Sequence, residues 1–228
     1  MELAIDTSTD IAGIALSHEG EMIAEMTWHS GRNHTVELVP NIANLLKQAK
    51  LNPQELSAVF VARGPGKFNG LRVGMSTAKG IAFALNIPLV GVSTLEIEAY
   101  PFAFTGLPVC PVHNASRGEI ATALYQQNGD DWCRLVDEYI TTTDALCQQI
   151  KEKTLFCGEI PSSVIQQLRQ RLGNQVIIPD STTRLRHAIC LATLGWRRLI
   201  KGDCDNPASL QPLYLRQPSI TQRKADKK

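Results

Sequence analysis

The first hundred residues alternate short apolar runs with polar turns, and this pattern predicts strands and helices in a definite order. Three short strands are expected to open the chain as an antiparallel meander, over residues 3–7, 11–17 and 22–28. A helix, a buried strand, a second helix and another strand follow, over residues 35–50, 57–63, 69–85 and 88–92. This order of elements is typical of a ribonuclease-H-like unit.

The second half of the chain carries a similar but weaker pattern. Strands are expected over residues 109–113, 120–126, 155–157 and 176–178, and helices over residues 143–151, 162–172 and 184–201. Asp6-Thr7-Ser8 after the first strand aligns with Asn114-Ala115-Ser116. We therefore expect an α/β protein with a two-lobed, duplicated ribonuclease-H-like fold of the actin-like ATPase superfamily. The lobes are placed at residues 1–100 and 101–218, followed by a basic tail at residues 219–228.

The composition narrows the class of protein. With 228 residues, 43% of them hydrophobic and 20% charged, the chain is too apolar to be disordered. Its longest apolar stretch, residues 81–92, is too short to span a bilayer. Glu2 and Asp6 are unlike a secretory signal, so a cytoplasmic location is expected. Because the six cysteines form no C-x-x-C pair, neither a zinc ribbon nor a redox pair is expected, and the thiols should be reduced.

The net charge of +1 hides an asymmetry between the halves. Residues 1–114 hold 7 basic and 10 acidic side chains, whereas residues 115–228 hold 16 and 12. The basic side chains gather at residues 184–201 and 223–228, and such clusters can attract phosphate backbones. Trp196 is the one aromatic residue within these two clusters, too few for a run of base stacking, which favours a solvated helix face and a basic tail.

The loop Asp6-Thr7-Ser8 is a candidate nucleotide-facing loop. In this superfamily a hairpin at the end of the first strand grips phosphates, and its Asp helps to order Mg²⁺. The loop lacks the glycines that let backbone N–H groups approach a phosphate, and Asn114 replaces the acid of the second hairpin. Two interpretations stay open for Asp6, a ligand-facing carboxylate and a simple turn cap.

A glycine-rich segment follows the fourth strand and opens the second helix. It begins Gly64-Pro65-Gly66 and is not a P-loop, since no Gly-Lys-Ser/Thr ending is present. Within the helix, small residues recur every four positions and form one stripe, at Gly70, Gly74, Ala78 and Ala82. A helical glycine costs up to ~1 kcal/mol relative to alanine, so the stripe predicts an unusually close neighbour. We expect that neighbour to belong to the chain itself.

The first helix has a wide apolar face but no metal-binding pattern. Leu38 and Leu45 lie beside its main stripe, which fits either an interaction surface or a broad core face. The residue four positions after His34 is Leu38, so no histidine pair shares a helix face, and no metal site is expected.

Five stretches of the chain resemble one family. They are Leu3-Ala4-Ile5-Asp6-Thr7-Ser8, residues 34–40, residues 64–74, residues 92–96 and Pro212-Leu213-Tyr214-Leu215-Arg216. Together they span most of the chain and closely resemble the bacterial TsaB family, also called YeaZ. The glycine-rich segment is the most distinctive of the five.

The resemblance implies a non-catalytic accessory subunit, or scaffold, for threonylcarbamoyladenosine (t6A), the modification of adenosine 37 in tRNA. A TsaD-like transferase would be its heterodimer partner and a TsaE-like ATPase a further partner. Without the transferase the chain would pair with itself. It would reach tRNA only through the complex and have no membrane contact, and no catalytic residue, cofactor or metal is expected in it.

The resemblance also suggests roles for particular residues. We place the partner interface on the helices of the first lobe, at His34, Leu38, Leu45, Leu71 and Met75. A second group is assigned to a structural motif, namely Gly64, Pro65, Gly66, Gly70, Arg72 and Gly74. Lys67 and Asn69 stand where the family usually has Ser and Thr, and Asn114 stands where it commonly has an acid. These differences affect the contacts expected at the loop and the second hairpin.

Two enzymatic alternatives remain at this stage. The first is a small-molecule kinase or carbamoyl-type transferase of the same superfamily that uses Asp6 for Mg²⁺-ATP. The second is a metallopeptidase. Substrate-dependent ATP turnover would favour the first, and stoichiometric bound metal the second.

Overall fold

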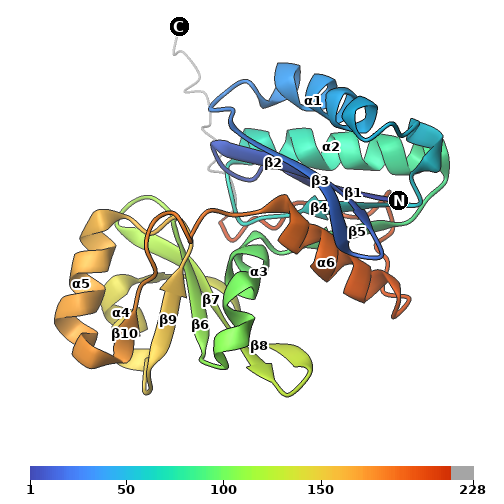
Figure 1. Ribbon diagram of the computed structural model, residues 1–228. Helices are drawn as coiled ribbons and strands as arrows, with labels where there is room; N and C mark the ends of the chain where they lie inside the picture. The colour runs from blue at the N-terminus through green and yellow to red at the C-terminus, as the bar shows by residue number, and fades with distance from the viewer. Residues whose placement is uncertain (217–228) are drawn as a thin grey trace, which may run out of the picture.

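The computed structural model describes residues 1–216 and divides them into two lobes, each built on one five-stranded sheet (Figure 1). In the N-terminal lobe the strand order is β3-β2-β1-β4-β5. β1, β2 and β3 are antiparallel, whereas β4 and β5 run parallel to β1. The strands are β1 (Glu2–Asp6), β2 (Ile11–His18), β3 (Glu21–His29), β4 (Ala58–Ala62) and β5 (Leu89–Val92). The predicted ribonuclease-H-like order is confirmed.

Helices cover both faces of this sheet (Figure 1). α1 (His34–Gln48) and α2 (Phe68–Leu85) lie on one face, and α6 (Ala188–Leu199) lies on the other. Side chains of β1 alternate between the two layers, so Leu3 and Ile5 join the core beneath α1 and α2 while Ala4 faces α6. All five residues of β1 are buried, as expected for a central strand covered on both sides.

The packing of α6 corrects the predicted lobe boundary. α6 comes late in the chain but packs on β1 to β5 of the first lobe, where Gly195 lets the helix backbone approach the Phe60 ring. The helix starts at Ala188 rather than at residue 184, because His187 is extended and Arg186 is held by ion pairs. Leu210 also joins the core of the first lobe. The C-terminal lobe is therefore not the continuous segment 101–218.

The second lobe repeats the topology of the first. Its strand order is β10-β9-β6-β7-β8, which read backwards matches the order of the first sheet. The strands are β6 (Val109–Asn114), β7 (Glu119–Asn128), β8 (Asp131–Thr142), β9 (Thr154–Cys157) and β10 (Val176–Ile177). α4 (Thr143–Gln149) and α5 (Ser162–Leu172) cover one face, and α3 (Thr94–Ala99) with the 3-10 turn η2 (Tyr100–Thr105) covers the other. The expected duplicated fold is confirmed.

Two elements of this lobe escaped prediction. β8 is an edge strand in which every residue is exposed or only partly buried, and its exposed Leu135 and Val136 stand among charged residues. The alternation of apolar and polar residues that marks a half-buried strand is therefore lost. α3 is only six residues long and runs directly into η2, so it offers too short a period to recognise.

The close neighbour of the α2 stripe is strand β1. A Cβ atom at Gly70 or Gly74 would lie well inside contact distance of Thr7. The Thr7 hydroxyl uses the space by donating a hydrogen bond to the Gly70 carbonyl, at 2.8 Å. The stripe thus serves packing within the chain and brings α2 down onto the end of β1.

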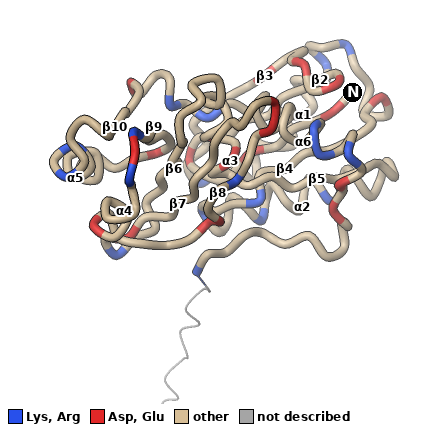
Figure 2. Tube along the Cα trace, turned by 90° about the horizontal axis from the view of Figure 1, so that it is seen from below, with Lys and Arg blue, Asp and Glu red and all other residues tan. Residues whose placement is uncertain are grey.

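Charged residues are distributed over both lobes in Figure 2 and are not gathered on one face. Within residues 1–216 no three His, Cys, Asp or Glu side chains lie together as a metal site would require. In the same part of the chain, none of the helices is long and apolar enough to cross a membrane. The predicted basic tail, residues 219–228, lies outside the described residues.

Candidate functional site

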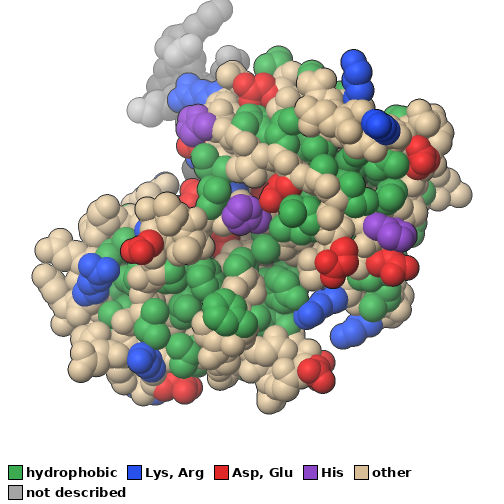
Figure 3. Space-filling model, viewed as in Figure 1, with side chains coloured by type: hydrophobic (Ala, Val, Ile, Leu, Met, Phe, Trp, Pro, Cys, Tyr) green, Lys and Arg blue, Asp and Glu red, His purple; other side chains and the backbone are tan. Residues whose placement is uncertain are grey.

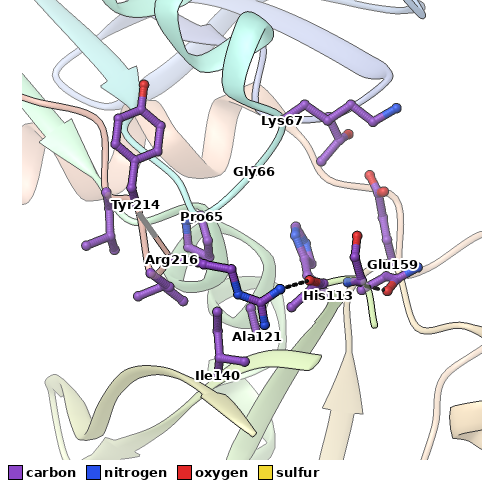
Figure 4. Close-up of a pocket in the computed structure, with 15 residues that line it drawn as sticks. Pro65, Gly66, Lys67, His113, Ala121, Ile140, Glu159, Tyr214 and Arg216 are labelled. Atoms are coloured by element: carbon purple, nitrogen blue, oxygen red, sulfur yellow. Dashed lines mark hydrogen bonds between the residues drawn. The ribbon is translucent and has the colours of Figure 1, made fainter. Parts of the chain in front are cut away.

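A cavity of about 500 Å³ lies between the two lobes (Figure 4). The glycine-rich loop lines it with Pro65, Gly66 and Lys67, the end of β6 contributes His113, and the C-terminal segment contributes Arg216. In actin-like ATPases the space between the lobes is where a nucleotide would be expected, so the residues behind this cavity decide what it can bind.

The Asp6 carboxylate is engaged inside the protein. Asp6 is 2% exposed. Its Oδ1 atom accepts hydrogen bonds from the Ser8 backbone N–H at 2.9 Å and from the Ser8 hydroxyl at 2.6 Å. Its Oδ2 atom accepts from Nε of Arg186 in a buried ion pair. Three of the roughly four acceptor positions of the carboxylate are thus used inside the protein.

The rest of the loop is covered by α2. Thr7 and Ser8 are buried, and a Cβ atom at Gly66 or Gly70 would collide with their backbone. The glycines that a phosphate-binding loop needs are present, but they belong to the covering segment and are used for packing. Asp6, Thr7 and Ser8, predicted as a nucleotide-facing loop, are buried in this structure and do not line the cavity, because α2 covers the loop and Arg186 pairs with its carboxylate.

Arg186 continues the ion network toward the second lobe. Its Nη1 atom donates to Glu98 on α3 at 2.9 Å, and its Nη2 atom donates to the Thr9 hydroxyl at 2.9 Å. Glu98 in turn meets Nε2 of His113 at 2.6 Å. Four titratable side chains from β1, the connector before α6, α3 and β6 are thus joined beneath the cavity.

The network shifts the pKa values of its basic members upward. Burial lowers the pKa of Arg186, but the carboxylates of Asp6 and Glu98 raise it by more. The net pKa is above the usual value, so the guanidinium is always charged. Burial likewise lowers the pKa of His113, while the charge and hydrogen bond of Glu98 raise it and prevail. Arg186 opposes this rise and Glu159 adds to it. The His113 imidazole therefore keeps its proton to a higher pH than a free histidine.

Sequence reasoning missed Arg186. Its partner Asp6 is 180 residues away in the sequence, and Arg186 stands in a basic stretch that reads as a solvated helix face. No local signal in the sequence links the two residues.

The cations at the cavity mouth are also paired. Lys67 contacts Asp10 at 2.5 Å, and this hydrogen bond holds the pKa of the Asp10 carboxyl below its usual value. Arg216 pairs with Glu119 on β7. Lys67 and Arg216 are thus each balanced by a neighbouring carboxylate, and Glu159, a further lining residue, lies 3.5 Å from Arg186.

All five residues predicted for the partner interface are buried. His34, Leu38, Leu45, Leu71 and Met75 are between 0 and 5% exposed, and Nε2 of His34 hydrogen-bonds the Thr9 carbonyl at 2.9 Å. They face the sheet or the neighbouring helix, so the broad apolar face of α1 is core. The prediction that these five residues form a surface contact is therefore corrected, because they are buried in the core.

Other apolar side chains of the same two helices do reach the surface. Val36 and Val39 on α1 are 69% and 58% exposed, and Phe83 on α2 is 85% exposed. Phe68 at the start of α2 is also exposed. In the space-filling view apolar side chains break the surface of this lobe around α1 and α2 (Figure 3).

The terminal motif packs against the start of α2. The Tyr214 ring lies 5.2 Å from that of Phe68, and the Tyr214 hydroxyl accepts from Nε of Arg72 at 3.2 Å. The Arg72 guanidinium also covers the Phe68 ring at 3.8 Å. Beyond it, Arg216 reaches Glu119 of the second lobe, so the segment crosses from one lobe to the other.

Relatives with known names share this architecture along nearly their whole length. A tRNA threonylcarbamoyladenosine biosynthesis protein TsaB from Bacillus subtilis is 36% identical over 219 residues, covering 94% of this chain and 93% of the relative. The chain belongs to the TsaB family. A family model described as "TsaD: tRNA N6-adenosine threonylcarbamoyltransferase" also matches residues 23–186, so TsaB proteins share a common fold with that transferase family.

Solved structures support the same fold. YeaZ from Pseudomonas aeruginosa superposes with a TM-score of 0.78 at 24% identity, covering 93% of this chain and 99% of that one. The activator of the 2-hydroxyisocaproyl-CoA dehydratase from Clostridium difficile, solved with bound ADPNP, superposes with a TM-score of 0.52 at 12% identity. It covers 88% of this chain and 96% of that one, and the likeness concerns the fold alone.

Proposed function

We propose that this TsaB-family chain is a non-catalytic accessory subunit that supports a TsaD-like transferase in forming t6A on tRNA. The observation that carries the proposal is the Asp6 loop, whose carboxylate is bound by Arg186 and whose backbone is covered by α2. A two-lobed chain that has closed its own nucleotide site is suited to holding a partner, not to turning over ATP.

The exposed apolar residues of α1 and α2 are the proposed contact with the transferase. We call Val36, Val39 and Phe83 the helical face. Val36 and Val39 stand near the start of α1 and Phe83 near the end of α2, and a partner that lies along both helices would bury all three. The TsaD-family match supports a partner of related fold, which would offer equivalent helices.

The same face would serve self-association when the transferase is absent. Isologous pairing through a helical face is the commonest way for a chain to form a homodimer. A TsaE-like ATPase would join the assembled complex. The scattered charges of the chain favour a tRNA that is held mainly by the partner.

The kinase or carbamoyl-type transferase alternative depends on an Asp6 carboxylate free to hold Mg²⁺-ATP. Both oxygens of Asp6 already accept hydrogen bonds from Ser8 and Arg186. Releasing the carboxylate would leave the Arg186 guanidinium buried beside Glu98 alone, at a cost of several kcal/mol. This geometry supports the accessory role over the enzymatic one.

Reconstitution of tRNA modification tests the proposal. Unmodified tRNA would be incubated with threonine, bicarbonate, ATP, the synthase, the TsaD-like transferase and the TsaE-like ATPase, with and without this chain. We expect t6A, measured by nucleoside mass spectrometry, to rise roughly tenfold or more when the chain is added. Equal t6A without the chain, or t6A formed by the chain without the transferase, would contradict the accessory role.

A further inference from the structure

The ion network beneath the cavity joins the two lobes at their core. Asp6 stands on β1 of the first sheet and His113 on β6 of the second, and the side chains between them are Arg186 and Glu98. The Asp6, Glu98 and Arg186 side chains are each 4% exposed or less, so water does not screen their charges.

Arg186 is the central member of the network, and its buried side chain has little contact with water. Each nitrogen of its guanidinium is used, since Nε meets Asp6, Nη1 meets Glu98 and Nη2 donates to the backbone carbonyl of Ile11 at 3.1 Å. A planar guanidinium that bonds two carboxylates on different elements fixes their relative orientation. Rotation of one lobe against the other would break at least one of these bonds.

We propose that Arg186 is an internal lock that fixes the angle between the two lobes without any bound ligand. Its positive charge lies between Asp6 of one lobe and the Glu98–His113 pair of the other. The protein is thereby held as one rigid body, whatever ligand is present in solution. This inference concerns the geometry of the chain alone and does not depend on the proposed role in t6A synthesis.

The location of Arg186 in the chain strengthens the inference. It stands in the connector that leaves the second lobe after β10 and returns to the first lobe as α6. Its neighbour Arg184 extends the contact by donating from Nη1 to the Gly158 carbonyl at 3.1 Å, in the turn after β9. A hinge motion would have to bend this connector, and the lock acts at that position.

Distances between spin labels on the two lobes test the lock. Labels would be attached to cysteines replacing exposed Lys47 on α1 and exposed Gln170 on α5, in a background where Cys133, Cys147 and Cys204 are serine. The test variant is R186M/D6N/E98Q/H113Q, which removes all four charged members of the network together, so that none of them stays buried without its partner. We expect its distance distribution to be roughly twofold broader than that of the labelled background chain in which the Arg186 network is intact.

Two further variants make the result decisive. E98Q alone keeps the Asp6–Arg186 pair but removes the ion pair with the second lobe, so it should also broaden the distribution. It provides the test if the multiple variant does not fold. R171M removes an arginine that pairs with Asp144 inside the second lobe, and it should leave the distribution narrow. Unchanged distributions in both network variants, or equal broadening in R171M, would overturn the lock.

Discussion

At the scale of single residues, Arg186 balances the buried negative charge between the two lobes. Arg186 satisfies the carboxylate of Asp6 and at the same time compensates the buried charge of Glu98. Removing one partner of such a buried ion pair typically costs about 3 to 5 kcal/mol. This is a large share of the ~5 to 15 kcal/mol by which a folded domain is stable. The network therefore stabilises the fold and at the same time occupies the Asp6 carboxylate.

His113 should make the stability of the protein depend on pH. Its pKa in the folded chain is raised above the unfolded value of about 6.5, because the Glu98 carboxylate outweighs the opposing effects of burial and Arg186. The stabilisation is fully present below pH ~6.5 and is lost as the pH rises through the folded pKa. Urea unfolding of the wild type and H113Q should therefore differ more near pH ~6 than near pH ~9. A difference that grows with pH would contradict this assignment.

The cysteines should separate sharply by reactivity. Burial raises the pKa of the Cys110 and Cys190 thiols to about 12, and it raises that of Cys157 as well. Cys204 is exposed. Brief alkylation of the native protein at pH ~8, read by peptide mass spectrometry, should modify Cys204 first and leave the other three intact. Modification of Cys110 at the rate of Cys204 would show that its burial is wrong.

At the scale of elements, the approach of α2 to β1 shapes the whole first lobe. Gly70 and Gly74 carry no side chain where Thr7 lies, and Gly80 on the same helix has open space around its Cα. The same substitution at these positions therefore has opposite consequences.

Gly74→Ala should destabilise the protein and Gly80→Ala should stabilise it. The new methyl at position 74 collides with the Thr7 hydroxyl, which costs ~1 to 3 kcal/mol of unfolding free energy. At position 80 the methyl meets nothing, so the gain in helix propensity is ~0.5 to 1 kcal/mol. Thermal or urea unfolding of the two variants measures both signs. A stabilised Gly74→Ala would mean that α2 lies farther from β1.

Sequence patterns predicted the elements with strong periodicity and failed where tertiary contacts decided. α1, α2 and the strands of the first lobe were expected because their apolar positions repeat clearly. β8 was missed since an edge strand need not alternate. Leu38 and Leu45 were misplaced because periodicity identifies an apolar face but not what covers it. Arg186 could not be paired with Asp6, since nothing local links residues so far apart.

At the scale of the whole molecule, the chain combines a rigid two-lobed body with an exposed helical face. The cavity between the lobes is lined by paired charges, and the Asp6 loop behind it is covered. The outer surface of α1 and α2 is the face that we propose for the partner.

The isolated chain should turn over ATP far more slowly than the ~1 to 10³ s⁻¹ of ordinary enzymes. The reason is that the Asp6 carboxylate is bound on both oxygens. Phosphate release from the purified protein measures the rate, and D6N provides the control, because a trace activity from a contaminant would be unaffected by it. Turnover within the ordinary range that D6N abolishes would restore the kinase alternative.

The most direct test of the scaffold account is the affinity of the chain for a TsaD-like transferase. Phe83 on α2 and Phe104 in η2 are equally exposed, at 85% and 86%, but only Phe83 lies on the helical face. Titration calorimetry should show that F83D and V39D each weaken binding by roughly tenfold or more, since burial of one apolar side chain contributes ~1.5 to 3 kcal/mol. F104D should bind like the wild type. Equal affinity of all four proteins, or a loss confined to F104D, would contradict the account.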